Sequence, residues 1–384
     1  MRVVLSPSAF HPSIGGVEVA TARLGAELVR RGHAVEIWTN RLVGTEATER
    51  VDSMAVRRFG FDLPAASPVA VARWCTAAPA TVLTLRRELR RFRPDLLHVH
   101  CFSGNGAWIL AAARSTRIPL VVSVHGETAM DDADIYRHSA ALRAALRSAM
   151  AHADAFTGCS RFALDHAQAT VGRRRLDAEV VFNGTDTPGP PAAPVWEPPF
   201  GRYVAAIGRV VPNKGFDLLL DAFSRLRQPY KKLGLVIGGG GAALHDLARR
   251  AEQLGIADRV AFTGPLSACQ VAAVMEGALA VVMPSRVEPF GMVALEAWRS
   301  GCPVVVSSRG GAPEFVTDGL DGLVVDPYDA AALADALARL VDDEQLAARL
   351  SAAGRERLAG FTWQAVTDRY EDVYRRACRL PPYQ

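Results

Sequence analysis

The sequence predicts two α/β domains, each built on a doubly wound sheet of mainly parallel strands. Its 384 residues are more than a single hydrophobic core usually holds. In both halves, short and continuously apolar runs alternate with segments of helical length, as in parallel sheets that are covered on both faces. Between the halves lies TPGPPAAPVWEPPF, at 187–200, whose six prolines exclude a packed helix or a central strand.

The first half opens with a β-α-β pattern. The apolar run 2–6 is followed by the glycine pair Gly15–Gly16, a helical pattern over 17–31 and a second apolar run at 33–39. Further strands are expected at 95–100, 119–125, 154–159 and 178–182.

The second half repeats this alternation. Strands are expected at 203–208, 233–238, 259–264, 278–285, 303–308 and 322–326, and a helix begins near Trp363. The expected division is therefore 1–190 for the first domain, 191–362 for the second, and 363–384 for the last helix. Ligands of open α/β sheets bind at the carboxyl ends of the strands, so the expected site is a cleft between the two domains.

Composition narrows the classes of protein. Hydrophobic residues make up 49% and charged residues 22%, which is ordinary for a globular chain. The net charge of +4 suits an anionic small ligand or a membrane surface as well as nucleic acid, so the charge alone does not decide between them. Six scattered cysteines without a CxxC pair favour a reduced, cytoplasmic chain. No apolar run approaches the ~18 residues of a membrane span, so membrane contact is expected to be peripheral at most. Neither first strand is followed by GxGxxG, which disfavours a dinucleotide oxidoreductase.

Two cations follow the first strand of the second half. Arg209 and Lys214 lie five residues apart in GRVVPNKGFDLLLDAF, before a helix. This position suits a pyrophosphate or a similar anion, although two solvated loop charges are the alternative.

The segment EPFGMVALE, at 288–296, is the next candidate for a binding site, and it begins and ends with a glutamate. Pro289 suits the first turn of a helix, which would leave the amides of Gly291, Met292 and Val293 free for anionic oxygens. Eight helical residues rise about 12 Å, whereas the paired carboxylates of glycosidases lie ~5–9.5 Å apart. Glu288 and Glu296 are therefore better explained as two contacts to one extended ligand than as an acid/base pair. A capping charge and a solvated charge are the alternative.

Weaker candidates lie in the first half. His125 ends a strand in VVSVHGE, and Gly15–Gly16 would let a ligand approach the backbone closely. Asp132-Ala-Asp134 resembles a metal-holding triplet, and His98 and His100 share one strand face, but no further ligand spacing supports a metal site. The basic run RRELRRFR, at 86–93, could touch anionic lipid, but a solvated helix face is the simpler explanation.

Taken together, these stretches resemble the family-four glycosyltransferases, which are retaining enzymes of the GT-B fold. The similarity runs through SIGGVE, HVHC, SVHGE, VFNGTDT, GRVVPNKGFDLLLDAF, VIGGGG, RVAFTG, PSRVEPFGMVALEAWRSGCPVVVSSRGGAPE and DGLVV. The most specific part is the E-x7-E segment preceded by the GR…KG pair. VFNGTDT departs from the more usual Pro-Asn-Gly-Val-Asp of the family at a turn.

The resemblance implies a role for each candidate. Arg209 and Lys214 would bind the donor diphosphate and stabilise it as the leaving group without a metal or another cofactor. Glu288, together with amides around Phe290 and Gly291, would bind the donor sugar. Other contacts would come from Met292 and Val293 at the phosphates, Glu296 at the ribose, His125 at the sugar, and Gly15 and Gly16 at the phosphates. The last helix would cross back onto the first domain.

The implied activity is retaining transfer of a hexose or N-acetylhexosamine from a nucleotide-diphosphate sugar, UDP-linked by preference, to a hydroxyl acceptor. A small molecule, a natural product, a glycan or a lipid would all fit as the acceptor, and no nucleic acid is expected. Two alternatives remain: a UDP-sugar epimerase, and a non-catalytic module that binds sugar nucleotides.

Overall fold

In the computed structural model, which describes residues 1–13, 15–63, 68–130, 134–187 and 197–381, the chain forms two units. Unit 1 comprises Met1–Asn183 and Trp363–Gln384, and unit 2 comprises Gly184–Thr362. The boundary expected between 190 and 191, and most of the proline-rich segment, lie outside the described residues. The final helix belongs to unit 1, and a single long segment of chain forms unit 2.

Unit 1 contains a sheet in the order β3-β4-β2-β1-β5-β6-β7-β8, which is parallel except for the β3–β4 pair. The strands are β1 (Arg2–Pro7), β2 (Ala34–Asn40), β3 (Thr48–Val51), β4 (Met54–Phe59), β5 (Leu96–His100), β6 (Leu120–Val124), β7 (Ala155–Gly158) and β8 (Glu179–Val180). The six strands expected in this half are confirmed. The hairpin of β3 and β4 was missed because its side chains are buried alternately and form no continuous apolar run.

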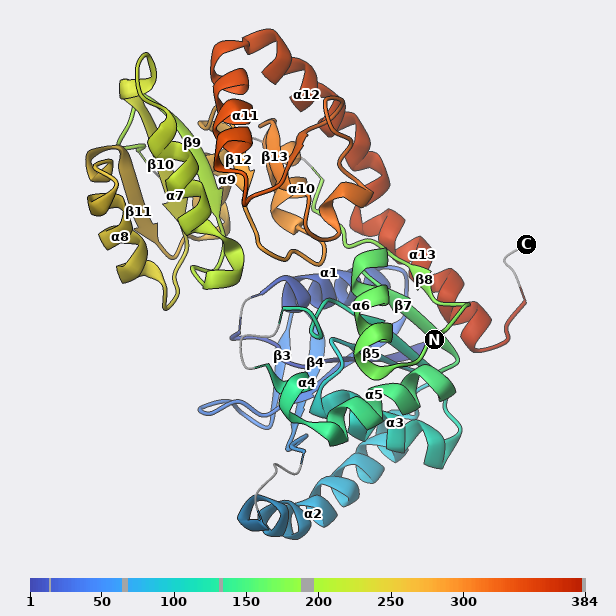
Figure 1. The fold of residues 1–384 in the computed structure, drawn as a ribbon. Helices are drawn as coiled ribbons and strands as arrows, with labels where there is room; N and C mark the ends of the chain where they lie inside the picture. Colours follow the sequence, from blue (N-terminus) through green and yellow to red (C-terminus); the bar gives the residue numbers. More distant parts are fainter. Residues whose placement is uncertain (14, 64–67, 131–133, 188–196, 382–384) are drawn as a thin grey trace. The chain divides into compact units, whose positions relative to one another are not determined.

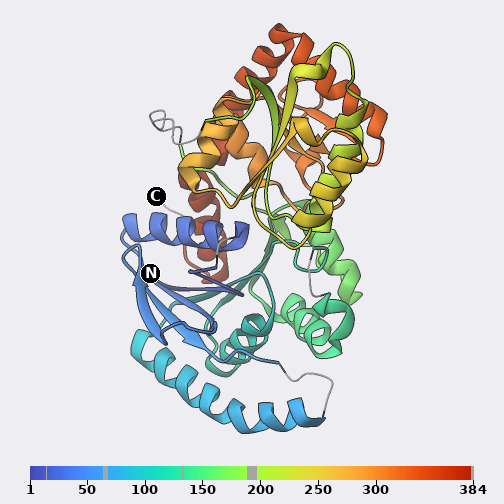
Figure 2. The same ribbon diagram turned by 90° about the vertical axis from the view of Figure 1, so that its left-hand side faces the viewer.

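Helices cover both faces of this sheet (Figures 1 and 2). They are α1 (Gly16–Arg30), α2 (Pro68–Phe92), α3 (Gly104–Thr116), α4 (Ile135–His138), α5 (Ala140–His152), α6 (Arg161–Val171) and α13 (Trp363–Ala377). Residues of α2, α3, α5 and α6 pack with Val4, Leu97 and Val99 on one face. Because side chains alternate along a strand, β5 directs His98 and His100 to the opposite face, where α1 and α13 lie.

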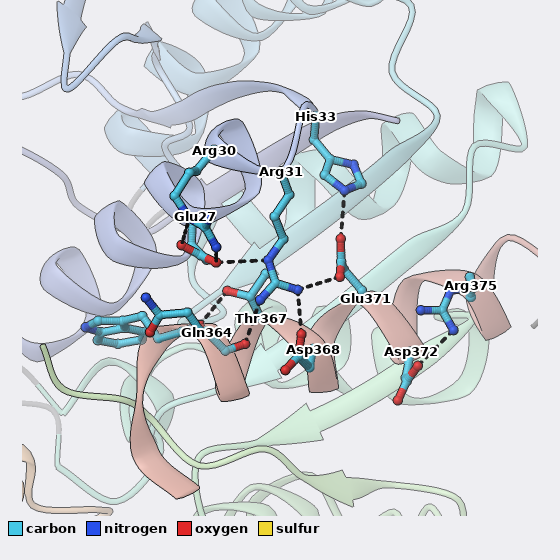
Figure 3. A network of polar contacts seen from close by, with 11 residues as sticks. Glu27, Arg30, Arg31, His33, Gln364, Thr367, Asp368, Glu371, Asp372 and Arg375 are labelled. Atoms are coloured by element: carbon cyan, nitrogen blue, oxygen red, sulfur yellow. Dashed lines mark hydrogen bonds and ion pairs between the residues drawn. The ribbon is translucent and has the colours of Figure 1, made fainter. Parts of the chain in front are cut away.

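Charged side chains tie α13 to the end of α1 (Figure 3). The guanidinium of Arg31 donates to Glu27 at 2.9 Å, to Asp368 at 2.6 Å and to Glu371 at 2.7 Å. It also donates to the carbonyl of Gln364 at 2.9 Å. The side chain of Arg31 is only 18% exposed, so this network is screened less than a surface ion pair.

We expect Arg31→Met to lower the free energy of unfolding by about 2 kcal/mol, because it leaves several carboxylates near each other without their shared cation. Arg30→Met is the matched control: Arg30 is 64% exposed and pairs with Glu27 of its own helix. Its loss should cost clearly less than the loss of Arg31, because water screens an exposed ion pair. Urea unfolding of the two variants tests this, and equal effects would show that Arg31 does not hold α13.

Unit 2 contains a wholly parallel sheet in the order β11-β10-β9-β12-β13-β14. The strands are β9 (Arg202–Ile207), β10 (Leu233–Gly238), β11 (Val260–Gly264), β12 (Val281–Met283), β13 (Val304–Ser307) and β14 (Leu323–Val325). This confirms all six expected strands. The order is that of a doubly wound nucleotide-binding sheet, whose direction of winding reverses between β9 and β12.

The helices of unit 2 lie on both sides of this sheet (Figure 1). They are α7 (Phe216–Arg225), α8 (Leu244–Gln253), α9 (Ala268–Glu276), α10 (Met292–Arg299), α11 (Ala330–Asp342) and α12 (Glu344–Arg357). Residues of α7, α8 and α11 bury one face with Val204, Leu235 and Val282. On the other face, Val274 of α9 packs with Tyr203 and Val236. This packing leaves the loops at the carboxyl ends of β9 and β12 as neighbours.

Candidate active site

The strongest candidate residues meet where the sheet of unit 2 reverses its winding. Lys214 ends a 3-10 turn (Pro212–Lys214) in the loop after β9, and Glu288 lies in the loop after β12. The Lys214 Nζ donates to Glu288 Oε2 at 2.6 Å. The side chains are 16% and 7% exposed, respectively, so the pair is largely withdrawn from water. Two charges that lie 74 positions apart in the sequence are thus joined at the place where sheets of this kind bind ligands.

The carboxylate of Glu288 is fixed through its side chain and its backbone. Ser285 Oγ donates to Oε2 at 3.0 Å, so this oxygen receives two hydrogen bonds. The Glu288 amide donates to the carbonyl of Arg309 at 3.1 Å, and its own carbonyl accepts from Gly311 at 2.8 Å. A Cβ on Gly310 would lie 2.0 Å from the Glu288 carbonyl oxygen. The SRGG segment, residues 308–311 after β13, therefore holds Glu288 by close backbone contact.

Arg286 locks the two loops together, and the sequence motifs did not reveal it. Its amide donates to Asn213 at 2.9 Å, and its guanidinium donates to the Pro212 carbonyl at 2.6 Å. The same guanidinium forms two bonds to Asp217 at 2.7 and 2.5 Å. These bonds raise the pKa of Arg286, although burial opposes the shift. Because Asn213 and Lys214 are neighbours, Arg286 positions the lysine through its backbone.

Arg209 lies two residues beyond the end of β9 and is exposed. It therefore stands at the same carboxyl edge as Lys214, as the sequence predicted. The two cations lie on one loop but differ in burial, because Arg209 is exposed whereas Lys214 is largely covered.

The segment around α10 differs from the expectation at its first turn. The helix begins at Met292 with Gly291 as its N-cap, so Pro289 lies outside it. Met292 and Val293 do open the helix, where amides have no intrahelical acceptor. Phe290 is buried, with its ring 4.7 Å from that of Phe315, so its side chain belongs to the core.

Glu296 lies in the second turn of α10 and is half-buried. Burial raises the pKa of its carboxyl, while the charge of Arg299 opposes the shift. Arg299 also forms an ion pair with Asp186 at 3.7 Å. A half-buried carboxylate with no hydrogen bond assigned to it among the described residues differs from the solvated surface charge considered above.

The first-half candidates lie in unit 1. Gly15 is the N-cap of α1, and Gly16 is exposed as the first residue of that helix, one residue before the start expected at 17. Ser13 Oγ donates to Glu18 Oε1 at 3.0 Å beside this helix end. His125 follows β6, and its Nε2 lies 3.1 Å from His100 Nδ1. From the sequence, His100 is explained by packing at the strand end in preference to a metal ligand, and no contact with His125 is expected.

Glu127 is a second residue that the motifs did not single out. Its Oε2 accepts from the amide of His125 at 2.7 Å, and its Oε1 accepts from the amide of Phe102 at 2.6 Å. Burial raises the pKa of this carboxyl to about 7, while backbone hydrogen bonds oppose the shift. Its place two residues after His125 in VHGE was the available signal.

The remaining sequence candidates have structural partners. His98 Nδ1 and Nε2 each lie 2.7 Å from a hydroxyl, those of Tyr374 and Ser123. No group of three or more His, Cys, Asp or Glu side chains in the described part of the chain is arranged to hold a metal ion. Asp132 lies outside the described residues, and Asp134 pairs with Arg137 at 3.6 Å.

The basic run belongs to α2, which lies beside β4 (Figure 2). Within it, Arg91 pairs with Glu36 at 2.6 Å and with Glu88 at 2.5 Å. Across the described ranges, no helix is both long and apolar enough to span a membrane.

The buried histidines of unit 1 predict an acid-sensitive fold. Burial lowers the pKa of His98 and His100 well below 6.5, with help from neighbouring histidines, and burial lowers that of His125 to about 4. Their stabilising contribution is therefore present above pH 6.5 and is lost as pH falls, because only the unfolded chain binds the three protons. Glu127 acts in the opposite direction. Its pKa is about 7 in the folded protein, against an ordinary value of 4.5, so the folded chain binds this proton first and gains stability as pH falls.

Three protons bound by the unfolded histidines, less the one bound by folded Glu127, leave a net difference of two. We expect the free energy of unfolding to fall by about 3 kcal/mol between pH 7 and pH 5. Urea unfolding across this range measures the slope. His98→Gln, which removes one titrating ring, should reduce it, and a protein that gains stability toward pH 5 would contradict the prediction.

Comparison with known proteins agrees with this architecture. Residues 14–188 match the family described as Glycosyltransferase Family 4, and residues 198–357 match Glycosyl transferases group 1. The chain therefore belongs to the family-four glycosyltransferases, whose fold is GT-B, and it is a glycosyltransferase.

Individual relatives cover nearly the whole chain. A glycogen synthase of Mycobacterium tuberculosis is 30% identical over 99% of this chain and 95% of its own length. A D-inositol 3-phosphate glycosyltransferase of Mycolicibacterium smegmatis is 32% identical over 94% of this chain and 86% of its own. Among solved structures, sucrose-phosphate synthase of Thermosynechococcus elongatus has a TM-score of 0.80 at 23% identity, covering 98% of this chain and 99% of that one. Anabaena HepE, solved with UDP, has a TM-score of 0.74 at 19% identity, covering 97% and 99%.

Proposed function

We propose that this glycosyltransferase moves a hexosyl or N-acetylhexosaminyl group from a nucleoside diphosphate sugar, a UDP-sugar by preference, to an acceptor hydroxyl with retention of configuration. The observation that carries the proposal is the Lys214–Glu288 pair of 2.6 Å at the reversal point of the unit 2 sheet. A buried cation paired with a carboxylate at a strand end offers one group for a phosphate and one for sugar hydroxyls.

The proposed chemistry needs no proton donor from the protein. The acceptor oxygen attacks the anomeric carbon while the bond from that carbon to the β-phosphate oxygen breaks. The acceptor proton passes to the departing phosphate, and the nucleoside diphosphate leaves. Lys214 and Arg209 stabilise the negative charge that grows on the diphosphate. Stabilisation of developing charge by fixed groups is usually the largest single contribution to catalysis. In this proposal, transfer needs no metal ion or other cofactor.

The other residues bind the donor. Glu288 accepts hydrogen bonds from sugar hydroxyls, and the amides around Phe290 and Gly291 help to bind the same sugar. The amides of Met292 and Val293 face the phosphates, and Glu296 accepts from the ribose hydroxyls. We also propose that His125 contacts the donor sugar and that Gly15 and Gly16 contact the phosphates. The fold neighbour Anabaena HepE, solved with UDP and with UDP-glucose, supports the choice of nucleotide.

We expect a thermal-shift screen of UDP-, GDP-, ADP- and dTDP-sugars to show stabilisation by UDP or a UDP-sugar. A ligand present at 100 times its Kd adds about 2.7 kcal/mol to the free energy of unfolding. Mass spectrometry of products formed from that donor and a pooled cell extract then identifies the acceptor. Stabilisation by no nucleotide would contradict the proposed function, and transfer abolished by EDTA would contradict its metal independence.

A further inference from the structure

Two histidines of unit 1 form a hydrogen-bonded pair at adjacent strand ends. His100 is the last residue of β5, and His125 directly follows β6, which is its neighbour in the sheet. His100 Nδ1 and His125 Nε2 lie 3.1 Å apart. The outer nitrogens of the pair are His100 Nε2 and His125 Nδ1. Both are buried, and neither has a hydrogen-bond partner among the residues described.

This contact requires the two rings to share one proton. Burial lowers the pKa of both rings, so both are neutral near pH 7 and each carries a single N–H. If His100 donates from Nδ1, then His125 accepts at Nε2 and must carry its own proton on Nδ1. If His125 donates from Nε2, then His100 must carry its proton on Nε2. The two rings are therefore either both Nδ1–H or both Nε2–H tautomers.

The surroundings hold His100 in place. Its ring centroid is 3.9 Å from that of His98, which is itself held by the hydroxyls of Tyr374 and Ser123. Tyr370 of α13 lies edge-on at 6.0 Å. Glu127 accepts the backbone amide of His125 but does not contact its ring nitrogens. In the described residues, the His100 contact is thus what orients the ring of His125.

We propose that His100 is a positioning residue: through the shared proton it fixes the ring of His125 and decides whether His125 Nδ1 donates to, or accepts from, a sugar hydroxyl. This inference rests on the proposed role of His125 at the donor sugar. An unpaired buried nitrogen is unfavourable, and a hydroxyl, which can donate and accept, satisfies it in either tautomer.

The tautomers can be measured without any ligand. Long-range 1H–15N spectra of 15N-histidine protein distinguish Nδ1–H from Nε2–H rings, and the variants His100→Phe and His125→Phe assign the two signals. We expect His100 and His125 to show the same tautomer, and His125 to lose its fixed tautomer in His100→Phe. Opposite tautomers in the native protein would overturn the proposal.

A kinetic cycle tests the positioning itself, with UDP release from UDP-glucose as the readout. His100→Phe should lower kcat at least about fivefold while changing KM for UDP-glucose less than about twofold. His100→Asn, whose amide can replace Nδ1, should recover most of the rate. In a His125→Ala background, His100→Phe should add less than about a twofold loss.

The outcomes distinguish the positioning role of His100 from the role of His125 at the donor sugar. If His100→Phe slows the reaction equally in both backgrounds, or not at all in the native one, His100 does not act through His125. If His125→Ala alone leaves kcat unchanged, the proposed role of His125 fails, whatever the tautomers are.

Discussion

Lys214→Ala is expected to lower the transfer rate at least about 100-fold, the range found when one charge-stabilising donor is removed from an active site. The variant loses the cation that Glu288 contacts at 2.6 Å. It should also lose about 2–3 kcal/mol of stability, because Glu288 is 7% exposed and would remain buried without its cation. Initial rates of donor turnover and urea unfolding measure the two effects.

The double variant Lys214→Met/Glu288→Gln separates catalysis from folding. It removes both charges, and replacing both partners of a buried pair is often close to neutral for stability. The side-chain amide that Glu288→Gln introduces can still accept the hydrogen bond from Ser285. We expect the stability of the double variant to recover to near the native value while transfer stays lost. Recovery of transfer along with stability would show that the pair serves the fold alone.

Gly215→Ala should disrupt the same site through the backbone. Gly215 has a φ of 66°, and an added Cβ would lie 2.0 Å from the carbonyl oxygen of Pro284. That oxygen belongs to the chain after β12, shortly before Arg286 contacts the β9 loop at Asn213. The close approach therefore sets how near Lys214 can come to Glu288. We expect the free energy of unfolding to fall by at least about 3 kcal/mol, because left-handed strain adds to a backbone clash. We also expect the variant to lose donor binding.

Gly319→Ala is the matched control for this substitution. Gly319 has a φ of 71°, yet an added Cβ would meet nothing within 4 Å. It should pay only the left-handed strain of about 1–2 kcal/mol and retain donor binding. Urea unfolding and thermal shifts with UDP distinguish the two variants. Equal losses in both would mean that the Pro284 contact does not constrain the loops.

Much of the fold could be predicted from local pattern. Strands such as Leu233–Gly238 and Val304–Ser307 are buried on both faces, so their apolar runs are continuous and easily seen. The β3–β4 hairpin was missed, since its alternating burial leaves polar residues between apolar ones. Helix α10 was expected one turn too early, because Pro289 fits a first turn but Gly291 adopts the left-handed N-cap.

The site divides in a similar way. Arg209, Lys214 and Glu288 could be proposed from the sequence because each follows an apolar run that must end at the same edge of the sheet. Arg286, Ser285, Glu127 and His100 could not be assigned, since their roles depend on contacts across loops. Arg286 reaches Asp217, 69 positions away, and His100 reaches His125, 25 positions away.

The sequence by itself determined the alternation of strands and helices, the two α/β domains and the cations and carboxylates at the strand ends. These follow from burial and chain direction, which act over a few neighbouring residues. Only the tertiary structure decided that Lys214 and Glu288 form one pair, that the SRGG segment holds Glu288, and that His100 meets His125. Such pairings depend on strand order and on the approach of backbones to within hydrogen-bond distance, which no local pattern encodes.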